Sequence, residues 1–466
     1  MKRIWFSLCF VFVVLAASAQ VSKTSGRLIV SKDGRDLQYE DGAPFFWLGD
    51  TAWELINKLT LNEIKLYLDN RASKGFNVIQ LTALSTGDLN KPNRYGEIPL
   101  HNLDPLTPNE KYFAILDSVV ELSRKRHMFV AIVATWGDKV VKPTGSDGGS
   151  VIFDKNNAYP YGKWMGSRYK KFSNVIWIMG GDVPGEKDAV DYRPIWREMA
   201  RGIGEGCNHQ CLITYHPNGE RSSSQWMQSE EWMDFNMIQS SHGRRNAPVW
   251  EMIKRDRSLT PVIPVLDSEP NYEDHPMSPW PTWKSDSGYF RDYDVRKQLY
   301  RAVFSGGCGV TYGHHAIWQF VNERDPVINY AERGWVNALD RPGAFQAGYL
   351  RKLMESRPLL GRKPDETIIM EGQGEKGQLI EAFRGDNDNY AMIYIPVGRK
   401  ISIDPSFLKS KKIAAWWFNP KDGAALNIGT FQQAKHLDFI PPVSGSENDW
   451  VLVLDNPAKN YSIPGK

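Results

Sequence analysis

The sequence predicts an α/β fold, a (β/α)8 TIM barrel followed by a smaller antiparallel β-domain, and three observations support this. Between Phe45 and about Ser356, short runs rich in Val, Ile and aromatic residues alternate with longer stretches of helical periodicity, which is typical of βα units and a parallel sheet. After Leu360, strand-like runs follow one another through Gly, Asp and Asn turns with no helix between them. The chain of 466 residues also exceeds what one hydrophobic core usually holds.

The barrel prediction depends on the number of strand-like runs in the first part of the chain. An open, doubly wound sheet is the alternative, but the Gly-rich phosphate-binding turn that often accompanies such a sheet is missing. We therefore favour the barrel. The eight expected strands are Phe45–Leu48, Asn77–Leu81, Met128–Ala134, Asn174–Met179, Cys211–Tyr215, Phe235–Gln239, Val262–Leu266 and Gly309–Tyr312.

Helical periodicity fills the segments between these strands. The first helix is expected from Leu61 to Lys74, with Gly75 ending it because glycine tolerates the left-handed turn that closes many helices. Further helices are expected over Glu110–Lys125, Val190–Ile203 and Val295–Ser305. We place the catalytic barrel at residues 20–362 and a β-sandwich-like accessory domain at residues 363–466.

The accessory domain has five expected strands and a pair of neighbouring tryptophans, Trp416 and Trp417. Adjacent strand residues point to opposite faces, so one of the two is expected in the core. We favour packing of this domain against the barrel over glycan binding. The expected strands are Glu366–Met370, Gln378–Arg384, Tyr390–Pro396, Ile413–Asn419 and Trp450–Leu454.

The first nineteen residues have the features of a cleaved signal peptide. Lys2 and Arg3 form a charged start, Ile4–Leu15 is a short apolar stretch, and Ala17–Ala19 provides small residues for cleavage. Cys9 lies inside the apolar stretch, so no lipid anchor in the membrane is expected. We expect a periplasmic or secreted protein.

The cysteines and the charge balance exclude several classes of protein. After the signal peptide only Cys207, Cys211 and Cys308 remain, too few for a disulfide scaffold. Cys207 and Cys211 form either a bridge or two free thiols. With 57 basic and 54 acidic residues the net charge is +3, so no nucleic-acid partner is expected. The 17 Trp and 19 Tyr side chains can stack on sugar faces, although a large core accounts for most of them.

Two of the expected strands end on carboxylates. One run ends at Gly180-Gly181-Asp182, and the other ends at Asp267-Ser268-Glu269-Pro270. Side chains at the carboxyl ends of barrel strands form the active site, and cleavage of a glycosidic bond requires a protonated acid and an ionised carboxylate. Asp267 and Glu269 share one strand face. We assign Glu269 as the nucleophile because it lies further toward the mouth, and Asp182 as the general acid/base.

Polar and aromatic residues that follow the strands are expected to bind the substrate. Four histidines, His216, His242, His314 and His315, could converge on a metal ion, but no His-x-His follows the first strand and no His-Glu-x-x-His helix occurs. We expect no metal and no cofactor, and we favour hydrogen bonds from the imidazoles to sugar hydroxyls. The expected substrate-binding residues are Asp50, Trp53, Thr82, Trp136, His216, His242, Tyr272, His314 and Trp318.

Four motifs carry a resemblance to a known family. They are Phe46–Trp53, Trp177–Asp182, Asp267–Glu273 and Gly313–Trp318, and their order resembles the apiosidase-like enzymes of glycoside hydrolase family 140. The resemblance spans nearly the whole chain after the signal peptide, including a C-terminal domain of the kind named "collagen-binding" in this group. It implies a (β/α)8 barrel, release of apiose from side chains of the pectin rhamnogalacturonan II, and a catalytic pair at Asp182 and Glu269. Asp182 departs from the wider clan, where many retaining barrels carry Asn-Glu at the fourth strand.

Several functions remain open at this point. We expect an exo-acting glycosidase because loops over Ser85–Asp104 and Asn271–Gly288 could close one end of the cleft. An arabinofuranosidase or a galactofuranosidase is an alternative, and a non-catalytic glycan-binding barrel is another. The expected partner is a plant pectic oligosaccharide, and the protein is expected to be a monomer. Sequence does not separate a retaining from an inverting mechanism.

Overall fold

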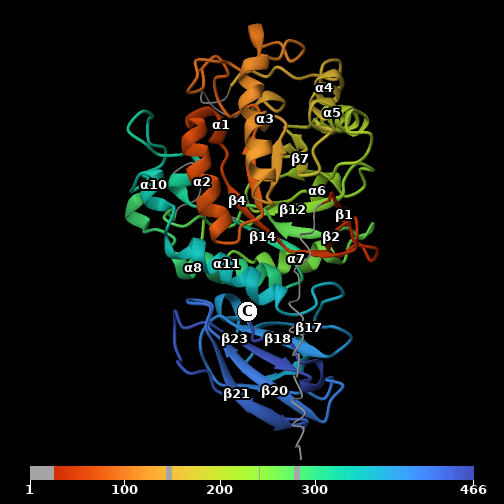
Figure 1. The fold of residues 1–466 in the computed structure, drawn as a ribbon, viewed down its shortest axis with the longest axis vertical. Coiled ribbons are helices and arrows are strands. Elements are labelled where there is room, and N and C mark those ends of the chain that lie inside the picture. Colours follow the sequence, from red (N-terminus) through yellow and green to blue (C-terminus); the bar gives the residue numbers. More distant parts are fainter. Residues whose placement is uncertain (1–25, 143–148, 241, 278–283) are drawn as a thin grey trace, which may run out of the picture.

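The computed structural model describes residues 26–142, 149–240, 242–277 and 284–466. A barrel with surrounding helices forms one half of the molecule, and a β-domain that contains the C-terminus forms the other (Figure 1). The predicted signal peptide lies outside the described residues. Part of the predicted loop Asn271–Gly288 also lies outside them.

Eight parallel strands close into a barrel, which confirms the predicted fold. Each strand pairs with its neighbours in sequence order, and the pairing of the last strand with the first, together with a pairing between the fifth and the sixth, completes the ring. The open-sheet alternative is therefore wrong. The strands are β4 (Trp47–Thr51), β5 (Val78–Thr82), β6 (Phe129–Val133), β7 (Val175–Gly180), β10 (Ile213–His216), β12 (Phe235–Gln239), β13 (Val265–Asp267) and β14 (Gly309–Tyr312).

Six of the eight barrel strands begin or end at a different residue from the prediction, and two of these differences have a local cause. The seventh barrel strand begins at Val265 and not at Val262, because Pro264 has no N–H to donate to a ladder. Phe45 belongs to an N-terminal antiparallel sheet that was not predicted, made of β1 (Leu28–Val30), β2 (Leu37–Tyr39) and β3 (Pro44–Phe45). Phe45 packs edge-on against Phe129 with ring centroids 5.3 Å apart. The sheet thus covers the end of the barrel where the strands begin.

The predicted helices are present with shifted ends. Gly75 ends the first one with φ of +87°, as expected. The helix predicted from Val190 begins at Arg193, because Val190 and Asp191 pair with β8 (Glu186–Lys187) as the short strand β9. The longer helices are α2 (Leu61–Ser73), α3 (Glu110–Arg124), α4 (Ala158–Tyr169), α5 (Arg193–Gly206), α7 (Val249–Arg257), α8 (Asp292–Phe304) and α11 (Pro342–Glu355). The short ones are α1 (Leu55–Lys58), α6 (Ser224–Met227), α9 (His315–Trp318) and α10 (Trp335–Ala338).

The C-terminal domain consists of two antiparallel sheets. The predicted run Glu366–Met370 opens as a single 3-10 turn, Glu366–Ile368, before its strand begins. The larger sheet has the order β15 (Lys363–Pro364), β17 (Glu381–Gly385), β18 (Tyr390–Ile395), β23 (Trp450–Asp455), β20 (Lys412–Phe418) and β21 (Ala425–Gln432), and the smaller has β16 (Ile369–Glu371), β19 (Ile401–Ile403) and β22 (Leu437–Phe439). Four strands, β15, β19, β21 and β22, were not predicted because they are short or carry few buried side chains. A further two-residue strand, β11 (Arg221–Ser222), pairs with β12 in the barrel.

The larger sheet packs directly against α8, and α11 packs beside α8 along the seam between the two halves (Figure 1). Tyr300 of α8 stacks on Tyr394 of β18 with ring centroids 5.0 Å apart. A buried ion pair joins Arg296 of α8 to Asp449, with Nη2 and Oδ1 2.7 Å apart. Trp417 is buried in this domain and contacts Trp450. The domain is therefore fixed to the barrel through a packed interface.

We predict that Asp449→Asn destabilises the whole chain. The Arg296 guanidinium and the Asp449 carboxylate are each almost fully buried, and removal of one partner leaves an uncompensated charge that costs about 3 kcal/mol or more. A urea unfolding curve should show a lower midpoint. Glu371→Gln, which alters an exposed carboxylate of the same domain, serves as the control. Equal midpoints for the two variants would contradict the prediction.

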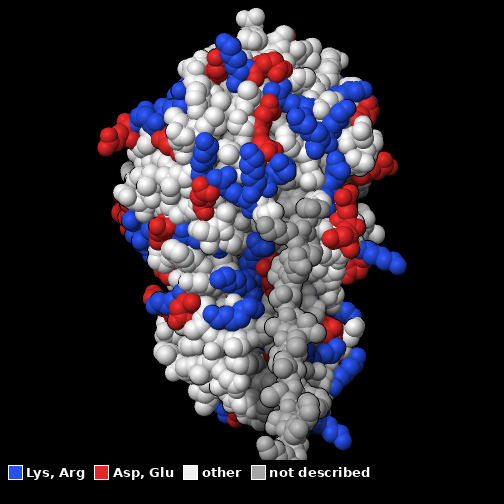
Figure 2. Space-filling model, viewed as in Figure 1, with Lys and Arg blue, Asp and Glu red and all other residues white. Residues whose placement is uncertain are grey.

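The described part of the chain contains three cysteines. Cys207 and Cys211 are joined by a disulfide, while Cys308 is a buried thiol. Both signs of charge are interspersed over the visible face, and Lys and Arg gather near the seam between the two halves (Figure 2). In the described part of the chain, no helix has the length and apolarity needed to cross a membrane.

Candidate active site

The two predicted carboxylates follow barrel strands that are three positions apart in the ring. Asp182 follows the end of β7, and Glu269 lies two residues beyond the end of β13. Because all eight strands run parallel, their carboxyl ends meet at one mouth. Both side chains therefore belong to the same end of the barrel, and they interact electrostatically with each other.

A left-handed turn places Asp182 at this mouth. Gly180, Gly181 and Asp182 have φ angles of +84°, +99° and +62°, a region that residues other than glycine rarely adopt. The turn brings the Gly181 N–H within 3.1 Å of the His216 carbonyl oxygen. The Asp182 N–H points to His216 Nδ1 at 3.4 Å. The acid is thus held by its own backbone against the neighbouring strand β10.

We predict that Gly180→Ala damages the site more than it damages the fold. A Cβ at position 180 would lie 2.4 Å from the His216 carbonyl oxygen, so the turn must move and carry Asp182 with it. Misplacement of a catalytic group by about 1 Å can cost roughly 100-fold in rate, and we expect a loss of that order in kcat/KM. Gly75→Ala is the matched control, because Gly75 has a similar φ and nothing within 4 Å of its Cβ position. The control should lose stability and keep its activity; equal activities would contradict the prediction.

Two imidazoles hold the Glu269 carboxylate. His242 Nε2 lies 2.9 Å from Oε1, and His216 Nε2 lies 2.8 Å from Oε2. The His216 contact is close but is not aligned as a hydrogen bond. Since His216 Nδ1 accepts the Asp182 N–H, its proton is on Nε2 and faces the carboxylate. Glu269 is 5% exposed, and burial alone would raise its pKa, but the two imidazoles outweigh this effect and lower the pKa well below its usual range.

The pKa of Asp182 moves in the opposite direction. Its side chain reaches solvent at the mouth, but the surrounding protein walls remove much of its hydration and are the main cause of a pKa raised to about 7. The negative charge of Glu269 adds to this rise, while His216 and a hydrogen bond from Gln239 oppose it. The two acids are therefore held in different protonation states near neutral pH, which is the pattern of an acid and base pair.

Asp267 has a supporting position. It is fully buried, its Oδ2 accepts a hydrogen bond from Ser240 Oγ at 2.7 Å, and its Oδ1 accepts the Ser240 N–H at 3.3 Å. Burial raises its pKa to about 7. Asp267 thus connects β13 to the end of β12, as expected from its lower position on the strand, and Glu269 remains the carboxylate at the mouth.

Aromatic rings form two walls beside the carboxylates. On one side Trp53 lies edge-on to Trp136 and to His216, with centroids 5.3 and 5.4 Å apart. On the other side His242 packs against Tyr272 at 4.1 Å and stacks on His275 at 4.9 Å. Trp136, His242 and Trp318 are partly exposed. These walls have flat surfaces suited to a sugar ring.

Two polar groups of the second wall, His242 Nδ1 and the Tyr272 hydroxyl, are buried beside Glu269 without a hydrogen-bond partner among the described residues. Burial and the nearby Glu269 charge raise the pKa of the Tyr272 hydroxyl, so it stays protonated. His275 was not predicted as part of the site; it contacts His242 and also His315, whose ring centroid is 4.3 Å away. Only the packing of the loop after β13 brings these rings together.

Three predicted substrate-binding residues face the protein interior, and we assign them structural roles instead. Asp50 contacts Arg71 Nε at 2.6 Å and is fully buried. The Thr82 hydroxyl donates to the Trp53 carbonyl oxygen at 2.9 Å. His314 contacts Asp274 through Nε2 at 3.2 Å and accepts the Ala316 N–H on Nδ1 at 3.0 Å. These three residues are at most 1% exposed, so their burial and the contacts above favour a structural role over binding of a sugar hydroxyl.

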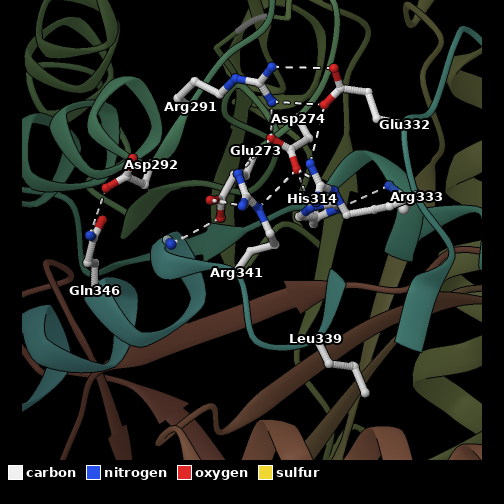
Figure 3. Close-up of polar contacts among 12 residues, drawn as sticks. Glu273, Asp274, Arg291, Asp292, His314, Glu332, Arg333, Leu339, Arg341 and Gln346 are labelled. Carbon is white, nitrogen blue, oxygen red and sulfur yellow. Dashed lines mark hydrogen bonds and ion pairs between the residues drawn. The ribbon is translucent and has the colours of Figure 1, made fainter. Parts of the chain in front are cut away.

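An ion-pair network that the sequence did not indicate holds the loop after β13. Asp274 lies among Arg291, Arg333 and Arg341, and also contacts His314 (Figure 3). Burial would raise the Asp274 pKa, but His314 and the arginines lower it well below its usual range. The network fixes the segment that carries Tyr272 and His275 to the loops that follow β14.

The described residues contain no group of three His, Cys, Asp or Glu side chains arranged to hold a metal ion.

A closed (β/α)8 barrel with an acid and a carboxylate at the ends of its strands defines the class of protein, a glycoside hydrolase. The chain belongs to the apiosidase-like family: the model described as "Apiosidase-like, catalytic domain" matches residues 31–361. Residues 363–455 match "Putative collagen-binding domain of a collagenase".

The chain is also similar to solved structures of glycoside hydrolases. A glycoside hydrolase family 5 protein from Bacteroides vulgatus ATCC 8482 is 31% identical, with a TM-score of 0.85 over 94% of this chain and 95% of that one. Another structure, titled "Glycoside hydrolase", is 32% identical with a TM-score of 0.84 over 94% and 98% of the two chains. A family 39 glycoside hydrolase from the gut symbiont Bacteroides cellulosilyticus WH2 shares the fold at 12% identity and a TM-score of 0.54, over 88% of this chain and 80% of that one. A search of curated proteins found no match.

Proposed function

We propose that this glycoside hydrolase is exo-acting and releases terminal apiose from the side chains of pectic rhamnogalacturonan II. Asp182 is the general acid/base and Glu269 is the nucleophile. The observation that carries the two catalytic roles is the opposite shift of the two pKa values at one mouth of the barrel. The apiosidase-like family model supports the choice of sugar.

In this mechanism protonated Asp182 donates its proton to the oxygen of the leaving group. Ionised Glu269 attacks the anomeric carbon, and the imidazoles of His216 and His242 keep the carboxylate ionised and fixed in place. After the leaving group departs, ionised Asp182 accepts a proton from a water that attacks the anomeric carbon. The bond between this carbon and Glu269 then breaks, which frees the sugar and restores the ionised Glu269 and the protonated Asp182. The rings of Trp136, Tyr272 and Trp318 provide surfaces for the sugar.

The setting of the reaction is part of the proposal. The predicted signal peptide supports export to the periplasm or the medium, and we propose that the protein acts there as a monomer on plant pectic oligosaccharides. The contacts of the C-terminal domain with α8 support a structural role for it, and we do not propose collagen as its ligand.

The experiment that tests the sugar is incubation with rhamnogalacturonan II oligosaccharides and chromatographic identification of the released monosaccharide. Apiose is the expected product, and Glu269→Gln should release none. Arabinose or galactose would instead indicate one of the other furanosidases. Binding without any release by the unaltered protein would indicate a glycan-binding barrel and would overturn the proposal.

We predict a pH profile whose alkaline limb follows Asp182. The acid must be protonated to donate, so kcat/KM should fall by about tenfold per pH unit above a pKa of about 7. Glu269 must be ionised, and its lowered pKa places the acidic limb below the usual glutamate value. Initial rates across the pH range, measured where the protein stays folded, check both limbs. An alkaline limb starting near pH 4 would contradict the assignment of Asp182.

A further inference from the structure

A cavity separate from the active site lies at the end of the barrel opposite the catalytic carboxylates. It has a volume of about 550 Å³. Its walls are the N-terminal loop at Asp33 and Arg35, the last turns of α7 and α8, and the linker to the C-terminal domain at residues 361–366. All of these segments precede barrel strands or leave the barrel, so the cavity is on the face where the strands begin.

The lining of this cavity carries an excess of positive charge. Five cationic side chains face two carboxylates, and no aromatic side chain is among the lining residues, which are Asp33, Arg35, Lys254, Arg257, Ser258, Ser305, Gly361, Arg362, Lys363, Pro364 and Glu366. Arg362 pairs with Asp36 at 3.3 Å, and Lys254 pairs with Glu366 at 2.9 Å. The other three cations form no ion pair with a described carboxylate.

Backbone contacts hold two of these unpaired arginines together. Arg35 Nη1 donates to the Arg257 carbonyl oxygen at 2.5 Å, and Arg257 Nη1 donates to the Gly306 carbonyl oxygen at 2.8 Å. Gly306 makes room for the guanidinium, since a Cβ there would lie 2.6 Å from Arg257 Nε. Burial, together with the like charge of Arg35, lowers the pKa of Arg257. The fold thus keeps like charges close to one another in a concave wall.

We propose that this cavity binds a small oxyanion, carried either by a phosphate or by the carboxylate of an acidic sugar. An oxyanion would relieve the repulsion between the guanidinium groups and accept charge-assisted hydrogen bonds from them. The absence of aromatic rings from the lining disfavours a neutral sugar. The site is separate from the carboxylate pair, so it is independent of the function proposed above.

Calorimetric titration of the purified full chain at constant ionic strength tests the proposal. The probes are inorganic phosphate, trigalacturonate and, as the uncharged comparison, maltotriose. We expect saturable binding of phosphate, trigalacturonate or both, and none of maltotriose at this cavity. Tighter binding of phosphate would identify a phosphate site, and tighter binding of trigalacturonate would identify an acidic-sugar site.

Variants assign the binding to this cavity. The double variant Arg35→Gln and Lys363→Gln should bind the preferred anion at least roughly tenfold more weakly and hydrolyse glycosides at the unaltered rate. If the double variant does not fold, Lys363→Gln alone is measured instead, because it changes only an exposed side chain. Its loss of affinity for the anion should be smaller than that expected of the double variant. Lys65→Gln, at an exposed lysine of α2, is the control. Undetectable binding of both anions, or full affinity in the Lys363→Gln variant, would overturn the proposal.

Discussion

Glu269→Gln should reduce kcat by at least about 10⁴-fold, the order of loss seen when a residue of a catalytic unit is removed. The amide has no charge with which to attack an anomeric carbon. It also replaces one of the two carboxylate oxygens with an NH2 group, and each of these oxygens is approached by the Nε2 of His216 or of His242. Binding of the substrate should persist, since the rings of the two walls are unchanged. Single-turnover kinetics and titration with an oligosaccharide measure the two quantities separately.

The control for this variant is Glu251→Gln, which removes an exposed carboxylate on α7 and should have no effect. Glu269→Ala adds a second test because it leaves no amide to face the imidazoles. Turnover in both position-269 variants close to that of the unaltered protein would exclude Glu269 from the mechanism.

Asp182→Asn should reduce kcat/KM on the natural linkage by about 10²- to 10⁴-fold, the range for loss of a general acid. The effect should depend on the leaving group, because only a poor leaving group needs a proton in the transition state. An aryl glycoside with an acidic phenol should therefore react with a much smaller loss in its first step. Comparison of the two substrates, each with the unaltered protein and the variant, measures this dependence.

Added azide extends the same experiment to the mechanism. In a retaining enzyme azide replaces the water that Asp182 would activate, so rate should return and a glycosyl azide should form with the configuration of the substrate. Equal losses on both substrates would show that Asp182 does not donate the proton. A restored rate with inverted product would mean that azide displaces the leaving group directly in place of Asp182, and it would overturn the assignment of Asp182 as the acid/base.

The chain itself indicated which strands form the barrel and which acids lie at their ends. Runs of Val, Ile and aromatic residues bounded by turns are local patterns, and Gly180, Gly181 and Pro270 mark strand ends through their own backbone properties. For this reason the eight strands and the candidates Asp182 and Glu269 could be named in advance. Strand boundaries were harder to predict where a single residue interrupts the hydrogen-bond ladder. Pro264 is such a residue, and β13 begins directly after it, at Val265.

The partners of each polar side chain could not be read from local patterns. His216 lies 53 residues from Glu269 in the chain, and the two meet only because β10, β12 and β13 are consecutive in the closed ring. Asp50 lies in the last residues of β4 and His314 follows β14, yet Arg71 and Asp274 keep them inside the protein. A residue at a strand end can be expected near the mouth of the barrel. Its place in the sequence does not predict whether its side chain points into the site or toward a partner inside the protein.

By itself, then, the sequence determined the order of the elements and the presence of two acids at strand ends, because periodicity and turn residues act over a few positions. Tertiary structure decided which acid is protonated, which histidines hold the other, and where cationic side chains gather in excess over carboxylates. Burial and the approach of charges from distant segments set these properties, and both exist only when the barrel is closed.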